Sequence, residues 1–135
     1  MKKTMFAAIF FAALITMSAK AQTIQEGINH LYADRYKSAL NTFQKILAVN
    51  PNVIEANYWL GQTYLDMDDN EAARQVYDKA LLANGNAPLL MVGKGHVLLL
   101  DKKIDEARQM FESALTISRT KKGDDPVILN AIGAA

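Results

Sequence analysis

Small and aromatic residues recur along this chain with a period of 34 residues. Four sets share the period, each with one member per unit: Gly27, Gly61 and Gly95; Ala39, Ala73 and Ala107; Phe43, Tyr77 and Phe111; Ile46, Ala80 and Ala114. Self-similarity at a fixed period of this length is the signature of repeat architectures, in which each unit packs only on its neighbours. The period therefore predicts a repeat array and argues against a single irregular globular domain.

Within each unit, the apolar residues recur at intervals of three and four positions, which is the spacing of a helical face. In the second unit, Tyr58, Gly61 and Leu65 share one face, and Ala73 and Tyr77 share another. Clusters of polar residues, proline and glycine separate the apolar segments at residues 50–52, 66–70, 84–86 and 122–126. Each unit is therefore predicted to be a helical hairpin. The helices are expected at 22–33 and 36–49 in the first unit, and at 87–100 and 104–119 in the third.

The small residues are expected at the points where helices cross. A side chain at a crossing holds the helix axes apart, so Gly61 on one helix opposite Ala73 on the other would permit close approach. Tyr77 lies one turn after Ala73 and would fill the space beside the crossing, and Ala80 would allow the next hairpin to pack. The substitution Gly61→Leu is predicted to disrupt the hairpin by overpacking, at a cost of about 1–3 kcal/mol or more.

After residue 21, the chain resembles the tetratricopeptide repeat proteins over almost all of its length. The small and aromatic positions of the family's pattern are matched by Gly27, Ala39 and Phe43; by Gly61, Tyr64, Ala73, Tyr77 and Ala80; and by Gly95, Ala107, Phe111 and Ala114. The third unit departs from the pattern at Lys94, where the family has an apolar residue. The first unit departs at Glu26 and His30, and this polarity suits a terminal cap of the array.

The resemblance implies an all-α fold: an α-solenoid of tetratricopeptide helical hairpins, with three repeats and the start of a fourth. We expect a repeat domain over 22–135, with repeats at about 22–53, 54–87 and 88–121 and a partial repeat at 126–135. Since the pattern restarts after Pro126, we expect this sequence to be the N-terminal part of a longer repeat protein. The alternative is a short final helix that covers the third hairpin. An open C-terminal face would also allow self-association.

Residues 1–21 have the organisation of a secretory signal peptide. A positively charged start precedes thirteen apolar residues at 5–17, and Ala19 and Ala21 form a small-x-small pattern before a predicted cut at Gln22. An apolar run of this length is too short for a membrane-spanning helix, which needs about 20 residues. An uncleaved anchor is the alternative. We expect an exported protein of a Gram-negative envelope, periplasmic or secreted, with no transmembrane span after cleavage.

Composition and motifs argue against catalysis, metal binding and nucleic-acid binding. The absence of cysteine rules out thiol catalysis and thiolate metal sites. The two histidines, His30 and His96, lie in no metal-binding spacing and are expected to be partly exposed, and the aspartates within 66–69 lack the pattern of a calcium-binding loop. Without residues 1–21 the net charge is about −2, whereas a nucleic-acid binder needs a basic surface. The chain is therefore predicted to be non-catalytic and to need no cofactor or metal.

In the tetratricopeptide repeat family, the first helix of each hairpin lines a concave groove, so the resemblance places a ligand site there. The family's groove positions correspond in this sequence to residues that include Tyr32, Glu55, Tyr58, Gln62, Leu89, Val92 and His96. The candidate ligand contacts are Glu55, Tyr58, Gln62, Val92 and His96, of which Tyr58, Gln62 and His96 are the strongest. The Lys, Arg and Asn cluster with which some members grip a C-terminal carboxylate is absent. Binding would instead bury an apolar or helical segment.

These features predict an exported, non-catalytic scaffold that binds a protein or peptide through the concave groove. The alternative is that the repeats are the N-terminal binding arm of a longer envelope protein, whose C-terminal part carries an enzymatic or cell-wall-binding activity. The length of the open reading frame beyond Ala135 separates these two hypotheses.

Overall fold

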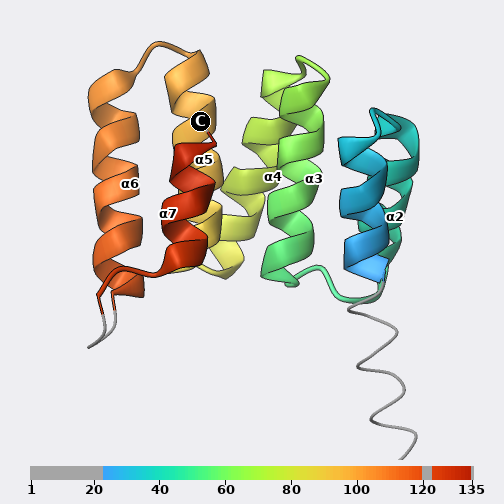
Figure 1. Ribbon diagram of the computed structural model, residues 1–135, viewed down its shortest axis with the longest axis horizontal. Helices are drawn as coiled ribbons and strands as arrows, with labels where there is room; N and C mark the ends of the chain where they lie inside the picture. The colour runs from blue at the N-terminus through green and yellow to red at the C-terminus, as the bar shows by residue number, and fades with distance from the viewer. Residues whose placement is uncertain (1–22, 120–122, 135) are drawn as a thin grey trace, which may run out of the picture.

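The computed structural model describes residues 23–119 and 123–134, and the predicted signal peptide lies outside these residues. A first helix spans residues 23–32. It is followed by α2 (Tyr36–Val49), α3 (Ile54–Asp66), α4 (Asn70–Ala83), α5 (Pro88–Leu100), α6 (Ile104–Ser118) and α7 (Pro126–Gly133). Consecutive helices run antiparallel and form hairpins, as Figure 1 shows. The chain is thus the all-α solenoid that its sequence pattern predicts.

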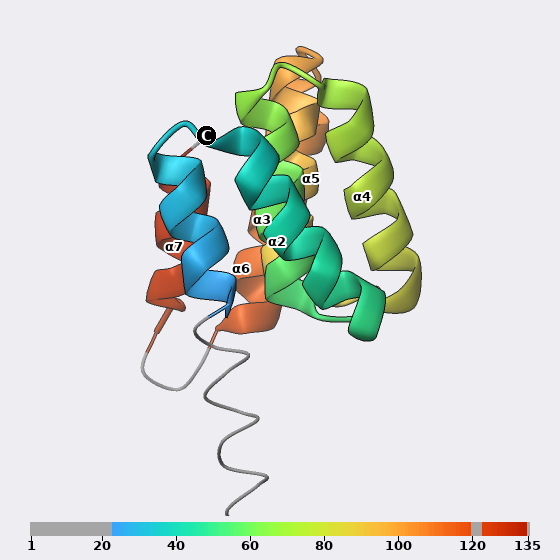
Figure 2. The same ribbon diagram turned by 90° about the vertical axis from the view of Figure 1, so that its right-hand side faces the viewer.

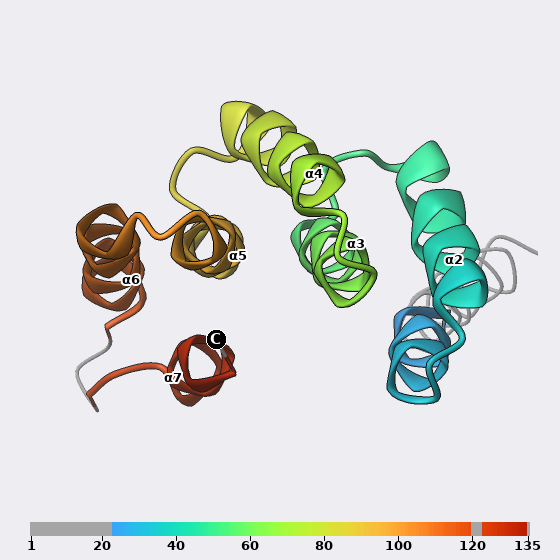
Figure 3. The same cartoon turned by 90° about the horizontal axis from the view of Figure 1, so that it is seen from above.

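The helices form two curved layers. Seen from above, the first helix, α3, α5 and α7 follow the inner side of an arc, and α2, α4 and α6 follow the outer side (Figure 3). Turned to its end, the molecule shows the first helix and α7 on the same side, which is the inner side of the arc (Figure 2). The inner layer is therefore concave and is bounded by a helix at each end.

The turn inside each hairpin repeats the same backbone conformation. Asp34, Asp68 and Lys102 have positive φ angles of 54°, 60° and 62°, and they are 34 residues apart. A residue in the left-handed region stops a helix and lets the chain reverse. The period that is visible in the small and aromatic residues therefore extends to these turns, although none of the three residues is a glycine.

Local signals explain several of the helix ends. Asp69 caps α4 by accepting a hydrogen bond from the backbone N–H of Ala72 at 3.0 Å, and Asp125 caps α7 in the same way through Val127 at 2.8 Å. α5 and α7 begin with proline, whose fixed φ angle and missing N–H suit the first helical turn. These ends are encoded locally, and the observed bounds of α2 agree with the predicted ones.

The glycine of each hairpin packs against the aromatic ring of the same hairpin. A Cβ atom built on any of these glycines would lie closer to the ring than real Cβ atoms approach, so only glycine fits against the ring. The shortest distances from such a Cβ atom are 2.5 Å for Gly27 to Phe43, 2.2 Å for Gly61 to Tyr77 and 2.3 Å for Gly95 to Phe111.

The reason for Gly61 therefore differs from the expected one. The side chain nearest to Gly61 is Tyr77, rather than Ala73, and the same ring lies against Gly93 of α5, where a Cβ atom would be 2.3 Å away. Tyr77 is thus held between glycines of two successive inner helices. The alanines at the packing positions are buried, as expected of close helix contacts: Ala39, Ala73, Ala80, Ala107 and Ala114.

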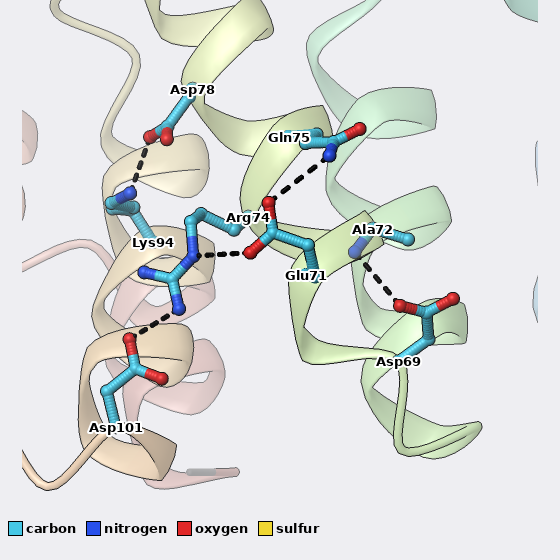
Figure 4. Close-up of polar contacts among 8 residues, drawn as sticks. All are labelled: Asp69, Glu71, Ala72, Arg74, Gln75, Asp78, Lys94 and Asp101. Carbon is cyan, nitrogen blue, oxygen red and sulfur yellow. Dashed lines mark hydrogen bonds and ion pairs between the residues drawn. The ribbon is translucent and has the colours of Figure 1, made fainter.

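Charged side chains join α4 to α5 at the junction between two hairpins (Figure 4). Arg74 donates to Asp101 at 2.6 Å, and Lys94 donates to Asp78 at 2.5 Å. Lys94, which departs from the apolar pattern of the family, is largely shielded from solvent and has an acidic partner on the neighbouring helix. The pairing explains why a charged residue is tolerated at this position.

α7 continues the inner layer after α5. Ile128 of α7 is buried with Met91 and Val92 of α5 and Ala114 of α6. A Cβ atom on Gly133, by contrast, would have no neighbour within 4 Å, so this glycine has no aromatic ring against it in the described part of the chain. No helix among the described residues is both long and apolar enough to cross a membrane.

Candidate ligand-binding groove

The concave layer carries a groove of about 640 Å³, which we call the concave groove. It is lined by residues of the first helix, α3, α5 and α7: Tyr32, Ile54, Glu55, Tyr58, Trp59, Leu89, Val127, Asn130, Ala131 and Ala134. Tyr32 and Val127 stand at opposite ends of the inner layer, whereas the residues of α3 and α5 lie between them. The groove therefore exists only because the superhelix brings the first helix and α7 to the same side.

Three aromatic residues, Tyr32, Tyr58 and Trp59, form what we call the aromatic cluster. The ring centroids of Trp59 and Tyr32 are 6.2 Å apart with an interplanar angle of 80°, and those of Trp59 and Tyr58 are 5.2 Å apart at 73°. The Tyr32 side chain is 75% exposed, whereas Tyr58 is 4% exposed. The cluster thus has a buried base and an open aromatic edge that can contact a ligand.

Glu55 is the one charged side chain among the residues that line the groove. It is exposed, and in the described part of the chain no basic side chain lies within ion-pair distance of it. Burial raises the pKa of Tyr58 to about 12, so its hydroxyl stays protonated at physiological pH and adds no charge. The groove is therefore apolar and aromatic, with a single carboxylate.

A smaller cleft lies toward the outer layer, among residues of α2, α3 and α4. It has a volume of about 300 Å³ and includes Leu47 of α2, Leu60 of α3 and Val76 of α4. No aromatic side chain lines this cleft. Aromatic residues contribute most of the energy at protein interfaces, so the concave groove is the better candidate for ligand binding.

The residues that the sequence proposed for ligand contact separate into two groups. Glu55 and Tyr58 line the concave groove. Gln62, Val92 and His96 lie instead between the helices, and Val92 and His96 are buried. In the described structure these three residues contact neighbouring helices, so a ligand in the groove would not reach the two buried ones directly.

A chain of hydrogen bonds joins Gln62 of α3 and His96 of α5 to α4 and α7. The Tyr77 hydroxyl donates to the Tyr58 carbonyl at 3.0 Å and accepts from Gln62 Nε2 at 2.8 Å. The same Gln62 nitrogen lies 3.1 Å from His96 Nδ1, and His96 Nε2 lies 3.0 Å from the Ala131 carbonyl of α7. Only a neutral imidazole with its proton on Nε2 accepts from Gln62 and donates to Ala131.

His96 is more buried than the sequence suggested. We expected a partly exposed helix residue, but the side chain is 5% exposed and lies edge-on to the Phe111 ring, with the centroids 5.9 Å apart. Burial lowers the pKa of His96, and its bond to the Ala131 carbonyl opposes this shift only partly. The histidine therefore positions α7 rather than offering a ligand contact.

The groove residues that the sequence analysis does not name are Ile54, Trp59 and the residues of α7. The positions of Ile54 and Trp59 are not groove positions in the family pattern, and the start of a fourth unit does not by itself show that α7 would form a wall of the groove. The sequence does contain one indication that Trp59 belongs to the groove: it is the sole tryptophan of the chain and follows Tyr58 directly. Tyr32 and Leu89, by contrast, were expected at groove positions and do line it.

The described residues hold no site for metal chemistry. Within them, no three His, Asp or Glu side chains come together in an arrangement that could hold a metal ion. Asp66 lies near Asp34, and burial, followed by the charge of Asp34, raises the pKa of Asp66. These two carboxylates make the end of α3 acidic, which adds to the negative potential at one end of the inner layer.

Comparison with known proteins supports the repeat architecture. The family model for the tetratricopeptide repeat matches residues 30–91. The chain is 28% identical to Tetratricopeptide repeat protein 1 of Schizosaccharomyces pombe over an alignment of length 89, which covers 58% of this chain. The chain spans only about 9% of the length of that protein.

Solved structures of similar fold extend over most of the chain. PcrH from Pseudomonas aeruginosa has a TM-score of 0.67 at 20% identity and covers 84% of this chain and 83% of its own. The first tetratricopeptide domain of Spaghetti (RPAP3), bound to an HSP90 peptide, has a TM-score of 0.65 at 14% identity, with coverages of 84% and 87%. The chain therefore has the all-α solenoid fold of tetratricopeptide repeat structures, and its residues 30–91 are similar to the tetratricopeptide repeat family.

Proposed function

We propose that this chain is an exported, non-catalytic scaffold that binds a protein or peptide segment in the concave groove. The observation that carries the proposal is the aromatic cluster at the open surface of the groove. An exposed aromatic edge on a buried base offers a large contact area with little side-chain entropy to lose on binding. The rest of the lining is mostly apolar, which suits the burial of an apolar face of a peptide or helix.

Two structural neighbours were solved with bound segments, which supports the same kind of partner. PcrH was solved in complex with the chaperone binding region of PopB, at a TM-score of 0.66 and 20% identity to this chain. The Spaghetti domain was solved with the HSP90 peptide SRMEEVD. These partners belong to those proteins, so the partner of this chain is to be identified by experiment.

Site-specific crosslinking tests the groove assignment. The photoreactive amino acid p-benzoylphenylalanine is placed at Tyr32, in the groove, or at Leu82, which is 90% exposed on α4 in the outer layer. Irradiation of cells that express the full chain is expected to give discrete crosslinked products from position 32. None of these products should also form from position 82. Identical adducts from both positions, or no adduct from position 32, would refute ligand binding in the concave groove.

Export has its own test. When the full chain is produced in a Gram-negative host, we expect it in the envelope or culture fraction, with Gln22 as its first residue after cleavage behind Ala21. N-terminal sequencing of the fractionated protein measures this directly. Recovery from the cytosol with residues 1–21 retained would show that the chain is not exported.

A further inference from the structure

Building on the proposed function, we infer that the concave groove selects peptide segments that present a Lys or Arg side chain, with the cation held by the aromatic cluster and Glu55. The occupant is thus a basic and apolar peptide segment. The polarity is the reverse of that of a carboxylate clamp, which needs basic residues in the groove. Among the described residues that line the groove, the charged one is an acid, Glu55.

The aromatic cluster has the geometry for binding a cation. A cation is attracted to the faces of Trp and Tyr rings when it lies within about 6 Å of the ring centroid. The centroids of Tyr32 and Trp59 are 6.2 Å apart and their planes are nearly perpendicular, so one cation can lie within reach of both rings. Because Tyr32 is 75% exposed, the approach from solvent is open.

Glu55 is placed to complete the site. It precedes Tyr58 by three residues and Trp59 by four on α3, and residues at these spacings are neighbours on a helix surface. Since no described basic side chain pairs with it, its charge is available to a ligand. A cationic group between a carboxylate and aromatic faces gains from both interactions, whereas an acidic segment would be repelled.

The surroundings of the groove reinforce this preference. Asp66 follows Trp59 by seven residues, two turns along α3, and Asp34 lies close enough to raise the pKa of Asp66. Lys94 and Arg74 are already paired with Asp78 and Asp101 on the α4–α5 junction, away from the groove lining (Figure 4). Asp34 and Asp66 thus place two carboxylates near the C-terminal end of α3, which favours a basic segment over an acidic one.

Selection from a peptide library provides the test. Phage-displayed random dodecamers are selected on the full-length protein in its processed form, and the binding of each enriched peptide to the Tyr32→Ala variant is then compared with its binding to the wild type. We expect the enriched peptides to share a Lys or Arg next to apolar residues. One enriched peptide is then synthesised with its Lys, and again with norleucine in the place of Lys, and the binding of both is followed through the fluorescence of Trp59, the only tryptophan of the chain.

We expect the norleucine peptide to bind about 5-fold more weakly than the Lys peptide, because it loses both the cation–π contact with the aromatic cluster and the ion pair with Glu55. The substitution Glu55→Gln should lower the affinity of the protein for the Lys peptide and leave its affinity for the norleucine peptide unchanged. Glu112→Gln on α6 in the outer layer removes the same charge and serves as the matched control; it should change neither affinity.

The outcomes separate this inference from the proposed function. If the two peptides bind equally, or if Glu55→Gln has no more effect than Glu112→Gln, the preference for a cation is refuted, while groove binding stands. If no peptide is enriched, or if Tyr32→Ala binds every selected peptide as well as the wild type does, binding in the groove itself is refuted and this inference falls with it.

Discussion

At the scale of single residues, the contact between glycine and an aromatic ring sets the tightest constraint on this sequence. Gly61 is required because the Tyr77 ring occupies the place that a side chain would take, and Gly93 of the next hairpin meets the same ring. The ring is completely buried, and it has little room to move because both sides are packed. A single added methyl group should therefore disturb two hairpins.

Gly61→Ala is expected to destabilise the protein by about 1–3 kcal/mol, because the new Cβ atom would lie 2.2 Å from Cζ of Tyr77. Gly133→Ala is the matched control. It also replaces a helical glycine but has open space around it, and it should be neutral or stabilising by up to about 1 kcal/mol. Urea unfolding monitored by circular dichroism measures both, and equal midpoints for the two variants would contradict the packing described here.

Lys102→Gly is expected to stabilise the protein by about 0.5–1 kcal/mol. Lys102 has a φ angle of 62°, and this conformation costs about 1–2 kcal/mol for a residue with a side chain. Glycine would remove this strain, but its greater conformational freedom in the unfolded state offsets part of the stabilisation. Asp68→Gly, at the equivalent turn, should gain less because aspartate tolerates this conformation better. A lower midpoint for Lys102→Gly would show that the lysine side chain stabilises the turn.

At the scale of helices, the positions that precede α2, α4 and α6 differ in capping although they are equivalent in the period. Asp69 caps α4, whereas Arg35 and Lys103 make no side-chain cap to α2 and α6. An aspartate at this position accepts a backbone N–H bond and also interacts favourably with the helix dipole. The hairpins are thus not equally well terminated.

Lys103→Asp is therefore expected to stabilise the protein by about 1 kcal/mol, and Asp69→Ala to destabilise it by a similar amount. The loss of the exposed ion pair between Lys103 and Glu106, 3.8 Å long, should matter little. Both changes are read from thermal unfolding. If Lys103→Asp lowers the midpoint, the geometry before α6 does not allow a cap.

The attachment of α7 to α5 depends on a neutral histidine. The described groups that contact His96 are Gln62 of α3, Phe111 of α6 and the Ala131 carbonyl of α7, none of which carries a charge. Protonation would place an N–H on Nδ1, which lies 3.1 Å from the amide nitrogen of Gln62 and 3.4 Å from its carbonyl oxygen. The imidazolium would exchange the shorter contact for the longer one and would bury a charge, because His96 is 5% exposed.

The stability of the protein should consequently fall as the pH falls below about 6.5, the ordinary pKa of histidine. The pKa of His96 is lowered in the folded state, so the unfolded chain binds the proton more readily and unfolding is favoured by acid. In His96→Gln this part of the pH dependence should disappear between pH 7 and 5. If His30→Gln removes it instead, the assignment to His96 is wrong.

At the scale of the whole molecule, each hairpin packs on its neighbours along the arc, so stability should vary along the chain. α7 has eight residues and lies at one end of the inner layer, while α4 and α5 lie inside the array and are joined by two ion pairs. Local opening should therefore begin with α7, and this opening would remove one wall of the concave groove.

Amide hydrogen exchange should show faster exchange in α7 than in α4 and α5, and a ligand in the concave groove should slow the exchange of α7. The first part needs no ligand and can be measured on the wild type by mass spectrometry. The substitution His96→Gln should speed the amide exchange of α7 more than that of α4. Equal protection along the chain would show that the described solenoid opens as one unit.

The helical hairpins follow from the amino-acid sequence. The 34-residue spacing and the helical spacing of apolar residues predicted the bounds of α2 and, within one residue, those of α5 and α6. These features are local, because helix ends depend on caps, prolines and left-handed turns within a few residues. The positions of Tyr32, Tyr58 and Leu89 on the concave face also followed from their place in the repeat.

The contacts of each repeated residue depend instead on how the hairpins pack against one another. The rotation between successive hairpins places the Tyr77 ring between two glycines, covers His96 and Val92 with α7, and brings Trp59 next to Tyr32. A repeat pattern specifies which face of a helix is apolar, but the neighbour on that face depends on how the units rotate about the solenoid axis. That rotation results from the packing of all side chains together, so the groove and part of its lining could be expected from the sequence, whereas the contributions of Trp59 and α7 could not.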